Sequence, residues 1–293
     1  MNSHALTTAP AQQPSAWRAE HIRFRPSESL AAFTSGRSDA GAPVVLFVHG
    51  MGHWTQAAWD RLAAELAATH RIIAFDLPGF GASSKPDAAY TLPYFGAALQ
   101  RVVAHFELDR FAIVGHSLGG LIAADYAARE PARVRLLGLI DPAGFLRTPK
   151  LALRVMASRP VAYFLSRLRP SRGFVRRTLH QSVYAPASVP PEMYERVYTL
   201  FQDPSVTRAF ARVYAGAMQE LLHMRELHVR LSRWTGPTVI VWGREDRFVP
   251  IRGLKLAHGV FPRAETLVLD HCGHCPNIEM PEAVAAQLIA SGL

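Results

Sequence analysis

Short apolar runs separated by longer amphipathic stretches fill the first half of the chain. The short runs are rich in Val, Ile, Leu and Phe, which is typical of strands buried on both faces of a parallel sheet. We predict such strands at residues 44–49, 71–75, 111–115 and 136–140. The stretches between them repeat apolar residues at helical spacing, which predicts helices at residues 57–69, 92–106 and 118–129. This alternation predicts a parallel sheet covered by helices.

The pattern changes after residue 144. Residues 145–232 are rich in Arg, are interrupted repeatedly by Pro and show no strand-like alternation, so we predict a helical insertion there. Strand and helix patterns then return, with strands expected at residues 237–242 and 265–270 and a last helix at residues 281–290. The runs at 21–25 and 30–34 are expected to form an antiparallel pair at the edge of the sheet.

These elements predict an α/β fold with a mostly parallel, eight-stranded sheet, helices on both faces and an inserted helical cap. Residues 21–144 and 233–293 are expected to form the α/β core, and residues 145–232 the cap. Residues 1–20 are rich in Ala, Pro, Gln, Ser and Thr and are expected to be a flexible tail.

The candidate nucleophile is Ser117, which stands between a predicted strand and a predicted helix. In the stretch Gly115-His116-Ser117-Leu118-Gly119 a sharp turn lifts the serine hydroxyl above the sheet, and the glycines keep side chains out of that turn. A serine hydroxyl needs a base in contact with it and a third group that orients the base.

The base and the acid are sought at the ends of later strands. Asp246 follows the strand at 237–242, and His274 follows the strand at 265–270, so the chain order is Ser, Asp, His. Asp141 also ends a strand and is the alternative acid. The nearby His271 competes with His274 for the role of base.

The candidate oxyanion donors are the backbone N–H groups of Met51 and Leu118, with Gly52 as a close alternative to Met51. Met51 lies in a glycine-rich turn after the first strand, and Leu118 begins a helix. We expect the surrounding pocket to include a further six residues: Gly50, Gly52, His53, Trp54, His116 and Cys275.

The sequence His-Cys-Gly-His-Cys at 271–275 also resembles half of a zinc site. A structural zinc needs a matched second pair of ligands, and the chain has only two cysteines, Cys272 and Cys275. We therefore expect no metal, and the serine mechanism requires no cofactor. Two cysteines without a disulfide framework, and no recognisable secretory signal, favour a cytoplasmic location.

The net charge of +9 is concentrated in one segment. Residues 142–191 contain nine Lys or Arg and no Asp or Glu; without these nine, the basic residues equal the 23 acidic residues in number. A local basic surface of this kind does not favour nucleic-acid binding. It favours weak contact of the cap with an anionic membrane or an acidic partner.

Apolar residues are mixed with these charges. Eight of them would suit a substrate pocket or the core of the cap: Leu151, Leu153, Val155, Met156, Val161, Tyr163, Phe164 and Leu165.

With these motifs in place, the chain resembles the α/β-hydrolase fold family, in its lidded esterase, lipase and carbon–carbon-bond hydrolase branch. The resemblance covers about residues 44–141 and 237–293 and rests on five motifs: His49-Gly50, Asp-Leu-Pro-Gly-Phe-Gly-Ala-Ser at 76–83, Gly-His-Ser-Leu-Gly-Gly at 115–120, Trp-Gly-Arg-Glu-Asp at 242–246, and Gly-His-Cys-Pro at 273–276 followed by Glu279 and Pro281-Glu282.

The resemblance implies Ser117 as nucleophile, Asp246 as acid, His274 as base, and the N–H groups of Met51 and Leu118 as the oxyanion hole. It also implies that Asp76 belongs to a structural turn. Dehalogenase and epoxide-hydrolase relatives carry Asp at the position of Ser117, so those activities are not expected.

The expected function is a serine hydrolase that cleaves a small carboxylic ester through an acyl-enzyme intermediate. One alternative is hydrolysis of a carbon–carbon bond in a vinylogous diketone, although such enzymes typically have Asn in place of His116 and Trp in place of Cys275. Another is a protein of this fold that binds a small molecule without chemistry. The pattern predicts no oligomeric state.

Overall fold

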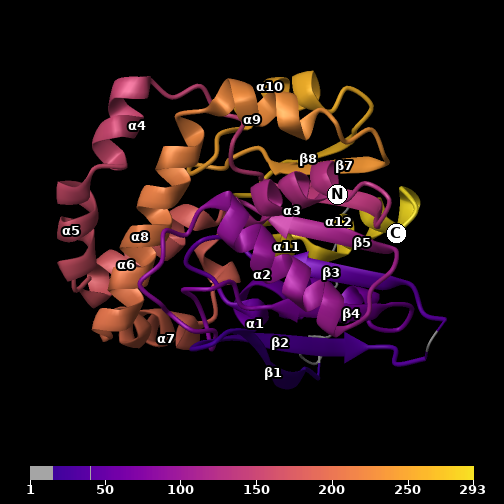
Figure 1. Cartoon of the computed structure of the whole chain (residues 1–293), viewed down its shortest axis with the longest axis horizontal. Coiled ribbons are helices and arrows are strands. Elements are labelled where there is room, and N and C mark those ends of the chain that lie inside the picture. Colours follow the sequence, from indigo (N-terminus) through magenta and orange to yellow (C-terminus); the bar gives the residue numbers. More distant parts are fainter. Residues whose placement is uncertain (1–15, 40) are drawn as a thin grey trace, which may run out of the picture.

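An eight-stranded sheet forms the centre of the molecule (Figure 1). The computed structural model describes residues 16–39 and 41–293. In spatial order the strands are β1 (Arg18–Arg25), β2 (Glu28–Gly36), β4 (Arg71–Phe75), β3 (Val44–Val48), β5 (Phe111–His116), β6 (Val134–Ile140), β7 (Thr238–Gly243) and β8 (Glu265–Leu269). The strands from β4 to β8 run parallel, and β1 and β2 are antiparallel at one edge.

Both faces of this sheet are buried, as the continuous apolar runs predict. Alternate residues of β3 belong to two different core clusters: Leu46 and Val48 to one, Val45 and Phe47 to the other. Helices α2 (Leu92–His105), α3 (Leu118–Arg129) and α10 (Leu254–Val260) complete the first cluster. Helices α1 (Thr55–Leu66) and α12 (Pro281–Ala290) complete the second. The predicted α/β fold is confirmed.

The predicted core elements agree with the structure to within a few residues. The bounds of β4, α3 and α12 match the prediction, and α1 begins two residues earlier than predicted. Its early start has a local cause, because the Thr55 N–H donates to Asp76 Oδ1 at 2.7 Å and fixes the first turn. The edge strand β1 begins at Arg18, inside the expected tail; residues 1–15 of that tail lie outside the described residues.

The segment between β6 and β7 is helical. It contains α4 (Lys150–Met156), α5 (Arg159–Arg167), α6 (Arg172–Ser182), α7 (Pro191–Gln202), α8 (Pro204–Leu221) and α9 (Met224–Leu231), with a 3₁₀ turn at Pro186–Ser188. Proline at the first or second position starts several of these helices, and the Ser171 and Asp203 side chains cap two of them. The prolines that interrupt the sequence pattern therefore begin separate short helices.

In Figure 1 these helices stand beside the C-terminal ends of the parallel strands, with α4 and α5 farthest from the sheet. Helix α9 returns the chain to the core, where Arg230 Nε donates to Asp125 Oδ1 of α3 at 2.6 Å. Two short elements complete the chain: a 3₁₀ turn (Ile251–Gly253) and α11 (Pro276–Glu279). Within the described ranges, no helix is both long and apolar enough to cross a lipid bilayer.

Sheet register determines where the functional candidates meet. His116 pairs with Ile140, and Gly243 of β7 pairs with Leu269 of β8. The loops that follow these strands therefore leave the sheet at one edge, which is where parallel α/β sheets place ligand sites.

Candidate active site

Ser117 is held in a strained turn between β5 and α3. Its backbone has φ 53° and ψ −119°, in the left-handed half of conformational space that residues other than glycine rarely adopt. A Cβ atom at Gly119 would lie 2.0 Å from the Val48 carbonyl oxygen, and one at Gly115 would lie 2.3 Å from the Gly119 carbonyl oxygen. Only glycine fits at both positions, so the motif is a packing requirement of this turn.

The two candidate oxyanion donors, Met51 and Leu118, line the same cavity as Ser117. Among the described residues, neither the Met51 N–H nor the Leu118 N–H donates to a protein acceptor. Leu118 opens helix α3, whose N-terminal end favours negative charge. The turn that contains Met51 is held by His49, which donates from Nδ1 to the Gly50 oxygen at 2.8 Å. Its Nε2 accepts from the Leu77 N–H, so His49 is structural.

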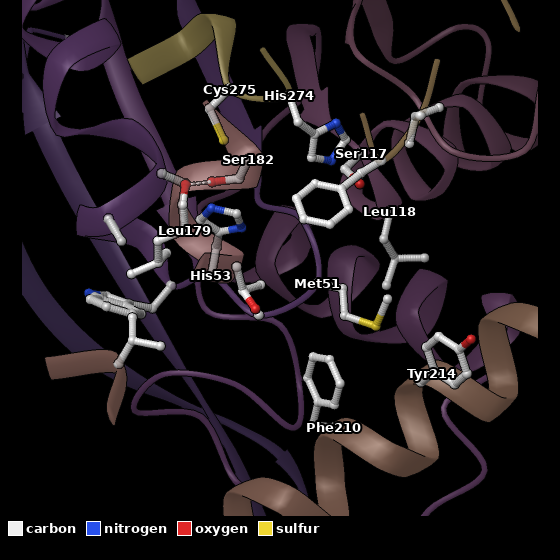
Figure 2. Close-up of a pocket in the computed structure, with 18 of the residues that line it drawn as sticks. Met51, His53, Ser117, Leu118, Leu179, Ser182, Phe210, Tyr214, His274 and Cys275 are labelled. Carbon is white, nitrogen blue, oxygen red and sulfur yellow. Dashed lines mark hydrogen bonds between the residues drawn. The ribbon is translucent and has the colours of Figure 1, made fainter. Parts of the chain in front are cut away.

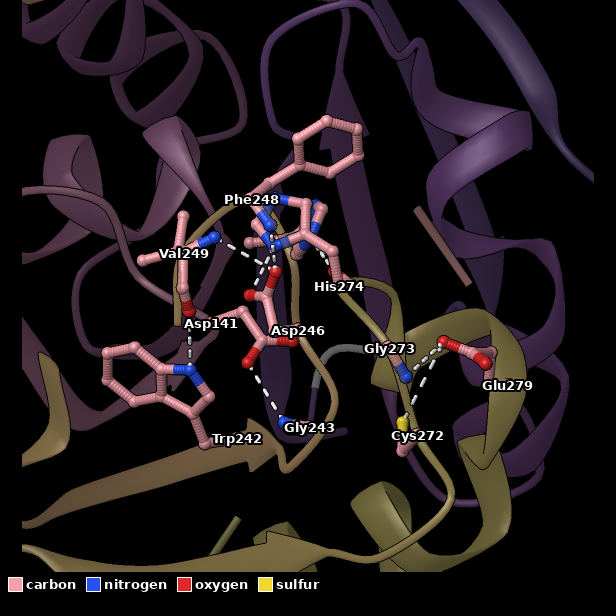
Figure 3. Close-up of polar contacts among 11 residues, drawn as sticks. Asp141, Trp242, Gly243, Asp246, Phe248, Val249, Cys272, Gly273, His274 and Glu279 are labelled. Atoms are coloured by element: carbon pink, nitrogen blue, oxygen red, sulfur yellow. Dashed lines mark hydrogen bonds and ion pairs between the residues drawn. The ribbon is translucent and has the colours of Figure 1, made fainter. Parts of the chain in front are cut away.

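Asp246 and His274 form a buried hydrogen-bonded pair (Figure 3). The His274 Nδ1–H donates to Asp246 Oδ2 at 2.6 Å, and the side chains are almost fully buried. The N–H groups of Phe248 and Val249 donate to Asp246 Oδ1 at 2.7 and 2.9 Å. These bonds fix the carboxylate and leave His274 Nε2 free to act on a neighbouring group. His271 is exposed and lies against Tyr184, away from Asp246.

The backbone of His274 is anchored from two sides. His116 donates from Nε2 to the His274 carbonyl oxygen at 2.6 Å, and the His274 N–H donates to the Ser182 oxygen of α6 at 2.8 Å. Glu279 supports the same loop by accepting the Gly273 N–H at 2.8 Å (Figure 3). One helix of the inserted segment therefore takes part directly in positioning His274.

Asp141, the alternative acid, lies next to this pair but has different hydrogen-bond partners. It is fully buried; its Oδ1 accepts the Gly243 N–H at 2.9 Å, and its Oδ2 has no partner among the described residues. Burial, reinforced by the charge of Asp246, raises the pKa of the Asp141 carboxyl well above its usual value. The hydrogen bond from His274 Nδ1 goes to Asp246, so Asp246 and not Asp141 is the partner of His274.

Histidine rings near Ser117 are kept neutral. Burial and the nearby His49 and His274 rings lower the pKa of His53 to about 4. Burial also lowers the pKa of His116 well below its usual value, and His53 and His116 meet edge to face at 5.4 Å between ring centres. These rings therefore bring no positive charge to the site at neutral pH.

The buried groups Asp141, Asp246 and His274 are also the set, among the described residues, that could hold a metal ion. They offer one ligand atom each within 4.8 Å of one another. The 2.6 Å bond between His274 and Asp246 already joins two of the three, and backbone N–H groups satisfy the rest of the Asp246 carboxylate. Cys272 and Cys275 are buried free thiols outside this set.

A large apolar cavity of about 1190 Å³ lies over Ser117 and His274 (Figure 2). Met51 and Leu118 line it together with four of the expected pocket residues: Gly52, His53, Trp54 and Cys275. The expectation is wrong for Gly50 and His116. Gly50 packs against His116 and Ser117, where a Cβ atom would lie 2.9 Å from His116 Nδ1 and 3.0 Å from Ser117 Cβ, and the His116 side chain is turned toward the His274 backbone.

Most of the cavity wall comes from the inserted helices. Of the eight apolar residues considered for the pocket or the core of the cap, Leu153, Met156 and Leu165 line the cavity. The expectation is wrong for four others, which are exposed because α4 and α5 turn only one face inward: Leu151, Val155, Tyr163 and Phe164. A further stripe of cavity residues lies on α8 and was not predicted, although its helical spacing was a usable signal: Phe210, Tyr214, Ala217, Met218 and Leu221.

The model of the alpha/beta hydrolase fold family matches residues 43–281 of the chain. The chain belongs to the α/β-hydrolase fold family. A curated relative, the 2-hydroxymuconate semialdehyde hydrolase of Pseudomonas sp. strain CF600, is 30% identical over 83% of this chain and 83% of its own length. An uncharacterized protein of Mycobacterium tuberculosis is 28% identical over 82% of this chain and 72% of its own.

Solved structures also resemble this chain over most of its length. A structure described as a membrane phospholipase A and bacterial virulence factor has a TM-score of 0.73 and 26% identity, covering 95% of this chain and 86% of its own. The 2-hydroxy-6-oxo-6-phenylhexa-2,4-dienoate hydrolase of Rhodococcus sp. strain RHA1 has a TM-score of 0.77 and 25% identity, covering 94% and 99%. These members of the α/β-hydrolase fold family have different substrates by name, so the protein is an α/β hydrolase whose scissile bond the family leaves open.

Proposed function

We propose that the protein is a serine hydrolase that cleaves carboxylic esters with a long apolar acyl chain. The observation that carries this proposal is the cavity of about 1190 Å³, lined largely by Leu, Val, Met and Phe, that reaches Ser117 and His274. An acyl chain is the ligand that gains most from such a wall, because its burial removes apolar surface from water. In this proposal residues 145–232 act as the cap that supplies the acyl site.

The mechanism assigns one role to each group. Ser117 Oγ attacks the ester carbonyl carbon and transfers its proton to His274 Nε2, while Asp246 stabilises the imidazolium through Nδ1. The oxyanion accepts hydrogen bonds from the Met51 and Leu118 N–H groups. His274 then donates the proton to the leaving alcohol. Water attacks the acyl-enzyme with His274 as base, which releases the carboxylic acid and restores Ser117.

Hydrolysis of a carbon–carbon bond in a vinylogous diketone is the second candidate function. It is supported by the name of the Pseudomonas relative, a 2-hydroxymuconate semialdehyde hydrolase. A dienoate substrate carries a carboxylate, which needs a partner when it is buried. The cavity wall includes two cationic side chains, and both are engaged. Arg61 donates to the Ile278 oxygen at 2.6 Å, and Arg196 stacks over the Trp54 ring at 4.5 Å. The wall therefore favours an uncharged acyl chain.

A panel of p-nitrophenyl esters from acetate to palmitate tests the proposal. We expect kcat/KM to rise with acyl length up to a medium or long chain, and to fall at least about 10³-fold in Ser117→Ala. A 2-hydroxy-6-oxo-dienoate assayed in parallel serves as the competing substrate. Preferential turnover of that compound would replace ester hydrolysis by the carbon–carbon reaction.

Labelling with a fluorophosphonate probe separates both enzymes from a protein that only binds ligands. We expect labelling of the wild-type chain and none of Ser117→Ala. An unlabelled wild-type chain that still binds a fluorescent fatty acid would support a binding protein.

A further inference from the structure

The outer helices of the inserted segment carry a concentration of exposed apolar side chains. Seven of the ten large hydrophobic residues exposed in the described parts of the chain lie between residues 151 and 184. The largest fractions are at Leu151 (73%), Phe164 (64%), Tyr163 (61%) and Phe174 (59%). Scattered single residues of this kind are ordinary, but a group on three consecutive short helices calls for a partner. We name these seven residues, on α4, α5, α6 and the turns that follow α5 and α6, the outer apolar surface.

The cations of the segment alternate along the chain with these exposed apolar residues. All nine Lys and Arg residues between 142 and 191 are exposed, and no acidic residue lies in that stretch. Arg167 stacks over the Tyr163 ring at 4.6 Å, so one of the charges is directly beside an exposed aromatic residue. Among the described residues, only Arg172 of these nine forms an ion pair, with Glu195. The remaining positive charge is uncompensated within the segment.

The outer apolar surface is continuous with the cavity. Leu168 and Phe174 both line the cavity and are exposed, by 38% and 59%. They flank the turn between α5 and α6. The apolar wall that leads to Ser117 therefore reaches the outside at that turn, which follows the helix that carries Tyr163 and Phe164. An acyl chain could move from an apolar environment outside to the cavity without crossing bulk water.

We propose that the outer apolar surface binds the surface of an anionic lipid bilayer, with the α5–α6 turn as the access route for a lipid acyl chain. Apolar and aromatic side chains interleaved with Arg and Lys fit the boundary between head groups and acyl chains, where rings are buried and cations meet phosphates. In Figure 1, α4 and α5 are the helices farthest from the sheet, so a flat surface can contact them without obstruction by the core. The access route rests on the proposed ester hydrolysis; the membrane contact does not.

Sedimentation of the full chain with vesicles tests the contact, using Ser117→Ala so that hydrolysis does not alter the lipid. The vesicles contain phosphatidylcholine alone or with phosphatidylglycerol. We expect at least about tenfold more protein to sediment with the anionic vesicles at low salt, and a loss of this difference at high salt. Equal sedimentation with both compositions, or none with either, would overturn the proposal. Absence of binding would also be the result if the basic surface served an acidic protein.

Substitutions on the outer apolar surface test whether this surface makes the contact with the vesicles. Tyr163→Ser with Phe164→Ser removes two exposed rings that do not line the cavity, and Arg154→Gln with Arg159→Gln removes two exposed charges. We expect each double variant to reduce vesicle binding about tenfold. Val229→Ser with Ile289→Ser is the matched control, because both residues are exposed but lie on α9 and α12. A control that loses as much binding as the ring variant would exclude this surface.

Activity measurements on a soluble ester and on a lipid ester in vesicles test the access route separately from the proposed ester hydrolysis. In an otherwise wild-type chain, the Tyr163 and Phe164 double variant should cleave soluble p-nitrophenyl butyrate at the wild-type rate. It should lose most activity on a lipid ester presented in anionic vesicles. Loss of both activities, with an unchanged circular dichroism spectrum, would refute the access route. A wild-type chain that sediments with vesicles but cleaves neither substrate would refute ester hydrolysis and leave the membrane contact standing.

Discussion

Two buried carboxyl groups lie close to His274, and their surroundings differ. Asp246 accepts hydrogen bonds from the His274 ring and from two backbone N–H groups, which together fix the position of both carboxyl oxygens. Asp141 accepts one backbone hydrogen bond, and burial raises its pKa. Both residues follow the ends of parallel strands, so position alone does not distinguish them. The two residues differ in the number and placement of the hydrogen-bond donors around their carboxyl groups.

This difference predicts very unequal effects of the same substitution, Asp to Asn, at the two positions. We expect Asp246→Asn to lower kcat/KM for a p-nitrophenyl ester by about 10³- to 10⁴-fold, because the amide cannot stabilise the imidazolium. Asp141→Asn should change it by less than about threefold, since an amide resembles the neutral acid and still accepts the Gly243 N–H. Steady-state kinetics of the two purified variants decide the point. A larger loss in Asp141→Asn would make Asp141 the acid.

The raised pKa of Asp141 also predicts a pH dependence of stability. Above about pH 4 the unfolded chain loses this proton while the folded chain keeps it, so the contribution of Asp141 to stability falls as pH rises toward its folded pKa. Asp141→Asn removes that dependence. We expect the Tm of the variant minus that of the wild type to increase from pH 4 to pH 8. A difference that stays constant over this range would show that Asp141 is ionised in the fold.

At the residue scale, sequence predicts the positions that local motifs specify. Ser117, Asp246 and His274 each follow a strand that is visible in the pattern, and the structure brings Asp246 and His274 into contact. The roles of Gly50 and His116 were missed, because they depend on neighbours far away in the chain. His116 turns toward the His274 backbone, which is separated from it by 158 positions.

At the element scale, α8 supplies part of the cavity wall, against which the proposed ester substrate would place its acyl chain. It presents residues four and seven or eight apart to the cavity, including Phe210, Ala217 and Met218. The opposite face of the helix carries exposed residues such as Arg212 and Gln219. A change on one face should therefore alter acyl selectivity, and a change on the other should not.

Ala217→Trp tests this division by filling part of the cavity. We expect kcat/KM for long-chain esters to fall about tenfold or more, while that for butyrate changes less than about threefold, because each methylene that no longer fits costs binding. Gln219→Trp, on the exposed face of the same helix, is the matched control and should leave the profile unchanged. Acyl-length profiles of the three proteins provide the measurement. Parallel losses at all chain lengths in Ala217→Trp would place the acyl chain elsewhere.

Helices and strands of the core follow from the sequence pattern more closely than the arrangement of the inserted helices does. Strands such as β4 and β5 are buried on both faces, so hydrophobicity alone marks them. Helix α5 is different: Leu165 faces the cavity, while Tyr163 and Phe164 are exposed. Apolar residues on both sides of a helix do not reveal which side meets the protein. That information lies in the packing against α8.

At the scale of the whole molecule, histidines that are wholly or partly removed from water make the fold sensitive to acid: His49 and His116 are buried, and His53 is half-buried. Burial lowers the pKa of His49, His53 and His116, and that of His53 falls to about 4. Below about pH 6.5 these side chains bind protons in the unfolded chain while they stay neutral in the folded one. Stability is therefore fully present above pH 6.5 and decreases as the pH falls toward 4.

For His53 alone the shift corresponds to a loss on the order of 2–3 kcal/mol between pH 6.5 and 4, so we expect a marked fall of Tm over that interval. His53→Gln removes one titrating group, and its Tm should decrease less steeply than that of the wild type. The exposed His223 or His271, replaced by Gln, serves as control with the wild-type slope. Differential scanning calorimetry between pH 7.5 and 4 measures the three slopes. Parallel curves for wild type and His53→Gln would mean that His53 titrates over the same pH range in the folded and the unfolded chain, and the lowered pKa of His53 would then be wrong.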